Sequence, residues 1–378
     1  MTLSIDILDR LIAFDTVSDR SNLELIDYVD AFLTTRGFRT NRIADPVELK
    51  AGLFAEIGPG VDGGILLSAH SDVVPIDGQV WTKPPFKLMR DGDRLFGRGT
   101  TDMKGFLAEM LAVADLVYDK ELKAPLKLLI SYDEEVGCVG LARMSERLEA
   151  VIGRPRLAIV GEPTEMQVAI GHKGKRAYRA LITGQAGHSA LAPQFVSALL
   201  VAVDFVGTLR HLQENLRQTG ARDADYDIPY STVHVGQLQS GRALNIVPDR
   251  AEVLFEVRHL SGDDPDDIEK LIDQAMAAVT AAHDDVPVID LQPLIAYPGL
   301  DVARSDAAVR AAQAWSGGQI CKVAFGTEAG LLSEMGVPTI VLGPGSMAGQ
   351  GHKSDEYIMQ SQLEECSNML AKAVEELL

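Results

Sequence analysis

Cysteine is scarce in this chain, whose 378 residues include three, Cys138, Cys321 and Cys366. Their number is odd and no two of them have CxxC spacing, which excludes a complete disulfide framework. Reduced thiols are typical of the cytosol, so we expect a cytoplasmic protein.

Long apolar runs and an excess of positive charge are also missing. No stretch is long enough to span a bilayer, and the first residues lack the basic and apolar regions of a signal peptide, so we expect neither a membrane span nor a leader. The net charge of -19 argues against nucleic acid or an anionic membrane as a partner. A small substrate is compatible with this charge, because its binding site can be locally positive.

What the chain does have is length and apolar residues. Its 378 residues, 46% of them hydrophobic, exceed one compact core of ordinary size, so we expect two domains. Helical stretches near 104–117 and 139–149 lie between apolar runs typical of buried strands. The strands are expected at 64–69, 126–131, 156–160 and 337–342. This order predicts an α/β domain that has a mostly parallel sheet with helices on both faces and binds ligands beyond the carboxyl ends of its strands.

The middle of the chain follows another order: strand, helix, strand, strand, helix, strand. These elements are expected at 175–183, 193–215, 231–238, 249–258, 265–282 and 286–294. The order predicts a small ferredoxin-like α+β domain at 175–296, inserted into a first domain formed by 1–174 and 297–378.

Histidine and carboxylate side chains follow three of the expected strands. His70 follows the first, Glu134 and Glu135 follow the second, and Glu162 follows the third. One such residue alone is usually a cap, a turn residue or a solvated charge. Several at one edge of a sheet repel one another unless a divalent cation binds between them.

Other polar residues have two interpretations each. Asp102, just before a helical stretch, is either a helix N-cap or a ligand, and His352, in a loop after the fourth strand, is either a surface residue or a ligand. In the inserted domain, the structural alternatives to function are a helix-capping neighbour for His188, a turn residue for Asn245 and a salt bridge to a same-face glutamate for Arg258.

Several different short motifs follow one another along the chain. They are His70-Ser71-Asp72, residues 99–105, Asp133-Glu134-Glu135, Gly161-Glu162-Pro163-Thr164, Gly187-His188-Ser189 and the late His352. In order and spacing they resemble the co-catalytic zinc deacylases and exopeptidases, a family that includes N-acetylornithine deacetylase, succinyl-diaminopimelate desuccinylase, aminoacylase and glutamate carboxypeptidase. The resemblance extends over essentially the whole chain.

The resemblance implies two zinc ions, with cobalt as a substitute, in an open catalytic site. Asp102 would bridge the two ions. His70 and Glu162 would complete one ligand set, and Glu135 and His352 the other.

The remaining roles also come from the resemblance. Glu134 would be the general base, and Asp72 would accept the second ring N–H of His70. The inserted domain would form a homodimer and act as a lid, with His188 of the partner subunit helping to hold the oxyanion. Arg258 and Asn245 would then bind the carboxylate of a small N-acyl amino acid.

The segment 326–330 resembles the acetylornithine branch of the family. Glu328 within it would meet a cationic side chain, or it is a carboxylate at a helix start. The resemblance therefore implies hydrolysis of N2-acetyl-L-ornithine in arginine biosynthesis, with succinyl-diaminopimelate and other N-acyl amino acids as alternative substrates. A relative that binds metal or peptide without catalysis would have lost a ligand or the base, and none is missing from this chain.

Overall fold

A computed structural model describes residues 2–283 and 287–378, and the chain divides into two compact units that are described separately below. The first unit comprises Met1–Gly171, Leu300–Val323 and Thr327–Leu378, and the second comprises His172–Gly299 and Ala324–Gly326. From the sequence, the inserted domain is expected to begin at residue 175 and to end at residue 296. In this division the second unit begins at residue 172, and its main segment ends at residue 299. Residue 286, the expected start of one strand, lies outside the described residues.

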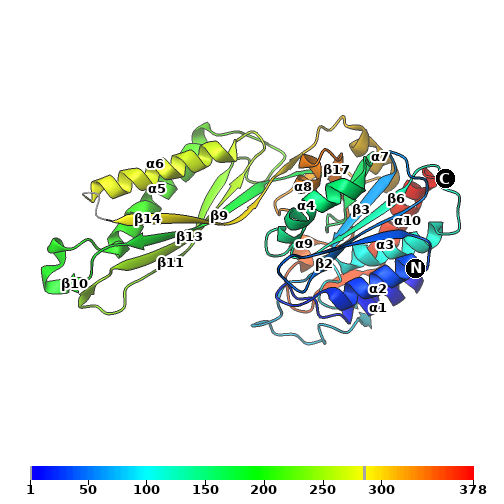
Figure 1. Ribbon diagram of the computed structural model, residues 1–378, viewed down its shortest axis with the longest axis horizontal. Helices are drawn as coiled ribbons and strands as arrows, with labels where there is room; N and C mark the ends of the chain where they lie inside the picture. The colour runs from blue at the N-terminus through cyan, green and yellow to red at the C-terminus, as the bar shows by residue number, and fades with distance from the viewer. Residues whose placement is uncertain (1, 284–286) are drawn as a thin grey trace. The chain divides into compact units, whose positions relative to one another are not determined.

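The first unit is built around a large sheet with the strand order β1-β2-β6-β3-β7-β17-β8-β15 and with β16 beside β8 (Figure 1). In that order the strands are β1 (Arg39–Ala44), β2 (Ala51–Ile57), β6 (Leu126–Ser131), β3 (Ile65–His70), β7 (Leu157–Val160), β17 (Thr339–Val341), β8 (Val168–His172) and β15 (Leu300–Asp301), with β16 at Ile320–Val323. The central strands β6, β3, β7 and β17 are parallel. They are the four strands expected from the sequence, and the predicted α/β fold class is confirmed. The whole sheet is mixed, because β2 and β8 join the central strands in antiparallel orientation.

Helices cover both faces of this sheet. One face packs against α1 (Thr2–Ile12), α2 (Leu23–Thr34), α3 (Lys104–Val117), α7 (Ala307–Ser316) and α10 (Gln360–Glu375). The other face packs against α4 (Val139–Ile152) and α8 (Ala329–Glu334). The short helix α9 (Met347–Gln350) precedes a small sheet in which β18 (Tyr357–Met359) pairs β5 (Arg94–Phe96), which pairs β4 (Met89–Asp91).

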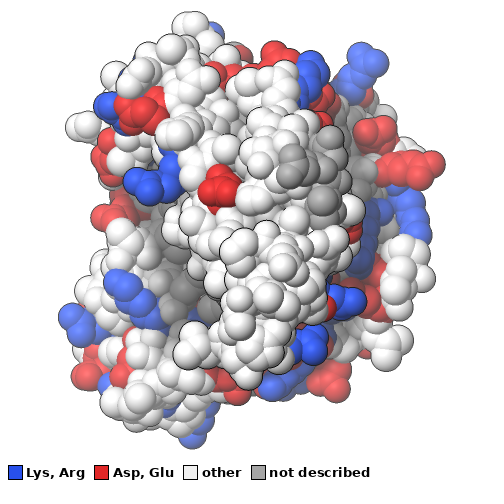
Figure 2. All heavy atoms as spheres, turned by 90° about the vertical axis from the view of Figure 1, so that its left-hand side faces the viewer, with Lys and Arg blue, Asp and Glu red and all other residues white. Residues whose placement is uncertain are grey.

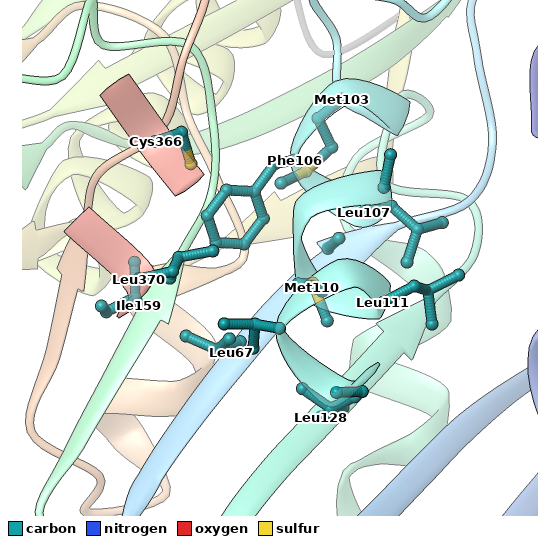
Figure 3. Close-up of a cluster of buried hydrophobic side chains, with 14 of the residues drawn as sticks. Leu67, Met103, Phe106, Leu107, Met110, Leu111, Leu128, Ile159, Cys366 and Leu370 are labelled. Carbon is teal, nitrogen blue, oxygen red and sulfur yellow. The ribbon is translucent and has the colours of Figure 1, made fainter. Parts of the chain in front are cut away.

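Alternating side chains of the strands build the two cores. Leu67 of β3 belongs to the core under α3, whereas its neighbour Leu66 belongs to the core under α4, as the two-residue period of a strand requires. Figure 3 shows Phe106 pointing from α3 toward Ile159 of the sheet and Leu370 of α10. This packing fixes the start of α3, and therefore the loop before it, against the sheet.

The second unit has the ferredoxin-like order expected from the sequence. Its antiparallel sheet runs β11-β13-β9-β14, and α5 and α6 pack on one face of it. The elements are β9 (Gly174–Thr183), α5 (Ala198–Thr219), β11 (Thr232–Ser240), β13 (Arg250–His259), α6 (Pro265–Ala282) and β14 (Val288–Tyr297). A two-stranded ladder of β10 (Gly187–His188) and β12 (Ile246–Val247) and the 3-10 helix η1 (Ser189–Gln194) complete this unit.

No helix within residues 2–283 and 287–378 combines the length and the hydropathy needed to cross a bilayer.

One carboxylate lies within the helical layer of the first unit. Glu109 of α3 is 1% exposed, and its Oε1 atom has no hydrogen-bond partner. Burial raises its pKa from 4.5 to about 7. An unfolded chain exposes the same group to water, so folding becomes less favourable as the pH rises from 4.5 through about 7.

Glu109→Gln is therefore expected to stabilise the protein at high pH, because the amide stays neutral at every pH. A shift from 4.5 to about 7 corresponds to about 3 kcal/mol. We expect the free energy of unfolding of the variant to exceed that of the wild type by up to this amount at pH 8. Near pH 5 the two free energies should agree within about 1 kcal/mol, as measured by urea unfolding. The exposed Glu364→Gln on α10 is the control, and an equal effect of both substitutions at pH 8 would contradict the assignment.

Candidate metal centre

The carboxyl ends of the parallel strands supply most of the expected ligands. His70 is the last residue of β3, Glu134 and Glu135 follow β6, and Glu162 follows β7. The chain between β7 and Glu162 passes close to the core, because a Cβ on Gly161 would lie 1.9 Å from Cδ1 of Phe106. Only glycine fits there, and this close approach fixes where Glu162 leaves the sheet.

Five residues come together in two groups. His70, Asp102 and Glu162 form one group, and Asp102, Glu135 and His352 form the other, with the ligand atoms of each group within 4.8 Å of one another. These are the two sets expected from the sequence.

Asp102 belongs to both groups through different oxygens. Its Oδ1 lies 3.1 Å from Nε2 of His70, and its Oδ2 lies 3.3 Å from Nε2 of His352. On the outer sides, Glu162 Oε1 is 3.7 Å from the same nitrogen of His70, and Glu135 Oε2 is 3.0 Å from that of His352. A single carboxylate thus faces both histidines, which is the arrangement of a bridging ligand.

The alternative role of Asp102 as a helix N-cap is wrong. Helix α3 begins at Lys104, its N-cap is Met103, and no side chain caps it. The loop that carries Asp102 is held by hydrogen bonds to residues outside helix α3, and in this position the Asp102 carboxylate faces the two histidines. The loop includes Gly99 with φ +85°, a conformation that favours glycine.

The carboxylates of the two groups are buried close to one another. Burial, together with the negative charge of Asp102, raises the pKa of Glu162 well above its ordinary value. The same two causes raise the pKa of Glu135 to about 7. Burying like charges is unfavourable, and a divalent cation between them removes the penalty.

The residues fit two metal ions. Oε1 of Glu135 and Oε1 of Glu162 are buried without a hydrogen-bond partner, as expected of atoms placed to bind an ion. The donors are imidazole nitrogens and carboxylate oxygens, with no thiolate among them, which suits zinc or cobalt. His352 is 53% exposed, so the second group is open to solvent.

Asp72 organises the loop of the two glutamates as well as His70. Nδ1 of His70 lies 3.0 Å from the carbonyl oxygen of Asp72 and 3.5 Å from its carboxylate, so the closer acceptor is the main chain rather than the expected carboxylate. That carboxylate accepts hydrogen bonds from the backbone N–H groups of Glu134 at 3.1 Å and Glu135 at 3.3 Å, and from Ser18 Oγ at 2.7 Å.

Asp133, just before the two glutamates, is held by a buried ion pair. It has a left-handed backbone with φ 55°, and Lys50 Nζ lies 2.7 Å from its Oδ1. Lys50 and Ser18 could not be predicted from the sequence, because neither lies in a motif and only the fold brings them to this loop.

Glu134 is half-buried beside the ligands and binds neither histidine. Cys138 Sγ donates to its Oε1 at 3.5 Å. Burial raises the pKa of Glu134 well above its ordinary value, and the charges of Glu135 and Glu328 act in the same direction. A carboxylate with a raised pKa can both accept and return a proton near neutral pH.

Glu328 lies at the start of α8 and is 1% exposed. Ser131 Oγ donates to its Oε2 at 2.7 Å, and burial raises its pKa to about 7. The helix-start position matches the structural alternative for this residue, and its contact with a cationic substrate stays a prediction.

The second unit contains the other three expected residues. His188 and Asn245 come together at the β10–β12 ladder, where His188 pairs with Ile246 and the N–H of Ser189 donates to the carbonyl of Asn245 at 3.1 Å. Both residues are exposed. Figure 2 shows this end of the unit, where most of the side chains nearest the viewer are uncharged.

The structural alternatives for these residues are all present. His188 Nδ1 accepts the N–H of Ala190 at the start of η1, and Asn245 lies in a turn. Arg258 donates to Glu256 on the same face at 2.9 Å and to the hydroxyl of Tyr297 at 2.8 Å. These contacts orient the side chains of His188 and Arg258, and the binding roles of all three residues stay predictions.

Residues 66–376 match the sequence model of a family described as peptidase family M20/M25/M40. The chain belongs to this family. The match spans both units and includes every residue of the two ligand groups. The chain is therefore a hydrolase of the M20 type.

Individual relatives agree with this membership. The chain is 35% identical over 374 residues to an acetylornithine deacetylase of Myxococcus xanthus, covering 97% of this chain and 95% of that protein. Among solved structures, it resembles an M20 family metallo-carboxypeptidase of Sulfolobus solfataricus at a TM-score of 0.82 and 20% identity, covering 99% of both chains. It also resembles a Bacillus subtilis protein described as a dinuclear metal binding peptidase of the M20 family, at a TM-score of 0.72 and 18% identity, covering 100% and 98% of the two chains.

Zinc is expected to stabilise the metal-free protein, because it binds the folded ligand groups and not the separated residues. At a free concentration 100-fold above Kd, the gain in unfolding free energy is about 2.7 kcal/mol per site. Asp102→Asn should remove most of this gain, since Asp102 serves both groups. The test is thermal unfolding with and without zinc after chelation, and the control is the exposed Asp119→Asn. Equal stabilisation of the wild type and Asp102→Asn would contradict a shared ligand.

Proposed function

We propose that this M20 hydrolase removes the acetyl group from N2-acetyl-L-ornithine and releases L-ornithine and acetate. The observation that carries the proposal is the pair of ligand groups sharing Asp102, with Glu134 beside them. The choice of substrate rests on the similarity to acetylornithine deacetylases over nearly the full length of both chains. We place the reaction in arginine biosynthesis and in the cytoplasm, where the free cysteines stay reduced.

The proposed site holds two zinc ions, with cobalt as a substitute. His70, Asp102 and Glu162 hold one, and Asp102, Glu135 and His352 hold the other. When bound, such ions supply Lewis acidity toward the amide carbonyl and lower the pKa of a coordinated water.

Glu134 carries the proton in this mechanism. Its carboxylate takes a proton from the attacking water, whose oxygen forms a bond to the acetyl carbon. The C–N bond then breaks, and Glu134 returns the proton to the departing amine nitrogen. The backbone bonds from Glu134 and Glu135 to Asp72 keep the base and the neighbouring ligand on one rigid loop.

Substrate recognition in this proposal comes from charged and polar groups. Arg258 and Asn245 bind the α-carboxylate, and an arginine fork suits a carboxylate. Glu328 recognises the δ-ammonium group of ornithine.

The inserted unit is the proposed surface of a homodimer. Leu200 and Val203 of α5 are 60% and 52% exposed, and β11 lies at the edge of its sheet. Exposed apolar side chains beside an open strand edge favour association with a second copy. In this dimer the exposed His188 reaches the partner's ligand groups and donates to the oxyanion.

Glu134→Gln is expected to lower kcat by about 10²–10⁴-fold while two zinc ions stay bound, because a neutral amide cannot take the proton. Turnover is measured on N2-acetyl-L-ornithine, N-succinyl-diaminopimelate and an N-acetylated neutral amino acid, and zinc content by elemental analysis. The wild type should have its highest kcat/KM on acetylornithine.

The exposed Glu149→Gln on α4 controls for loss of charge and should leave turnover unchanged. A higher kcat/KM on the succinylated substrate would overturn the choice of substrate. Full activity of Glu134→Gln would overturn the role of the base.

Mixing two inactive variants tests the role of the partner subunit. An equal mixture of the His188→Ala and Glu134→Gln proteins should recover about one quarter of wild-type activity after subunit exchange. About half of the dimers are then mixed, and each mixed dimer has one intact site of two. Activity is assayed before and after subunit exchange, and mixing either variant with itself is the control. A mixture that stays inactive although the dimers exchange would show that His188 does not act across the interface.

A further inference from the structure

Glu356 is a buried carboxylate outside both ligand groups, and it is 1% exposed. Its oxygens accept four hydrogen bonds from the loop that carries Asp102. Oε1 accepts the backbone N–H groups of Thr101 at 2.8 Å and Asp102 at 3.1 Å. Oε2 accepts the N–H of Gly99 at 2.9 Å and Nη1 of Arg98 at 2.7 Å.

The main chain adds to these contacts. The N–H of Gly97 donates to the carbonyl of Glu356 at 2.9 Å, and Thr101 Oγ1 donates to the carbonyl of Tyr357 at 2.7 Å. The loop before α3 is therefore bonded along its length to the segment that follows His352.

Arg98 extends the connection to the His352 segment itself. Its Nη1 donates to the carbonyl of Lys353 at 3.2 Å, and its Nη2 donates to Oε1 of Gln79 at 2.6 Å. Gln79 in turn donates through Nε2 to the carbonyl of His352 at 2.9 Å. The two ligands Asp102 and His352 are thus linked through Glu356, Arg98 and Gln79.

Only a carboxylate satisfies this arrangement. Four donors converge on Glu356, and an ionised carboxylate has about four acceptor positions, whereas an amide oxygen has two and its NH2 group would face other donors. The buried guanidinium of Arg98, 1% exposed, compensates the negative charge.

We propose that Glu356 and Arg98 form a positioning pair that fixes Asp102 and His352 relative to each other and thereby sets the affinity for the ion held by Asp102, Glu135 and His352. The inference rests on the metal site of the proposed function and not on the choice of substrate. Neither residue binds the ion. They act through the backbone of the two loops.

The test is equilibrium zinc binding to metal-free protein, measured by competition with a chromogenic chelator that resolves the two sites. Glu356→Gln is expected to weaken zinc binding 10–100-fold, as is usual for groups that orient ligands. Asp355→Asn is the matched control, because it removes the same charge one residue away, from a carboxylate that accepts bonds from Thr82 and Lys83 instead. It should bind zinc within about two-fold of the wild type.

Two milder variants guard against loss of folding. Glu356→Asp keeps the charge and shortens its reach, and Gln79→Ala removes only the link to the carbonyl of His352. Gln79→Ala should weaken zinc binding at the group that includes His352 and leave zinc binding at the group that includes His70 unchanged. A purely structural role would instead lower the melting temperature of the metal-free protein without such selectivity between the two groups. Folded Glu356→Asp and Gln79→Ala proteins with wild-type affinity at both sites would overturn the inference. A wild type that binds two zinc ions but cleaves none of the acylated substrates would overturn the proposed function alone.

Discussion

The carboxylate of Asp102 lies between two histidines, and each of its oxygens faces one of them. Glu135 and Glu162 lie on the outer sides, and all three carboxylates are buried or nearly so. Such a cluster is unfavourable without positive charge, because the dielectric inside a protein screens repulsion poorly. The surrounding fold has to hold these groups together against that repulsion.

Two buried carboxylates do much of this holding, and both act on the main chain. Asp72 accepts the N–H groups of Glu134 and Glu135, and Glu356 accepts those of Thr101 and Asp102. In each loop, peptide N–H groups are directed to a buried carboxylate, and one side chain of the loop, Glu135 or Asp102, belongs to a ligand group. The negative charge therefore has two uses in this centre: some carboxylates are placed to bind metal, and others fix the loops that carry them.

The sequence predicted the parts of the centre that depend on local pattern. Apolar runs followed directly by His70, or after one glycine by Glu162, marked the ends of parallel strands, and the parallel strands then explain why these residues meet. Antiparallel β2 and β8 were missed because their residues have no such marker. Lys50, Arg98 and Glu356 were missed for another reason: a charged residue is ordinarily exposed, and nothing in the local sequence shows that the fold buries it with a partner far along the chain.

The two ligand groups differ in how much of the polypeptide they require. His70, Asp102 and Glu162 all precede the inserted unit, whereas the other group is complete only with His352, close to the end of the chain. The first group therefore needs only segments that precede the inserted unit, whereas the second needs the chain to return to the first unit after it. Closing the long connection between Glu135 and His352 costs conformational entropy, so the second group depends more than the first on the folding of the whole first unit.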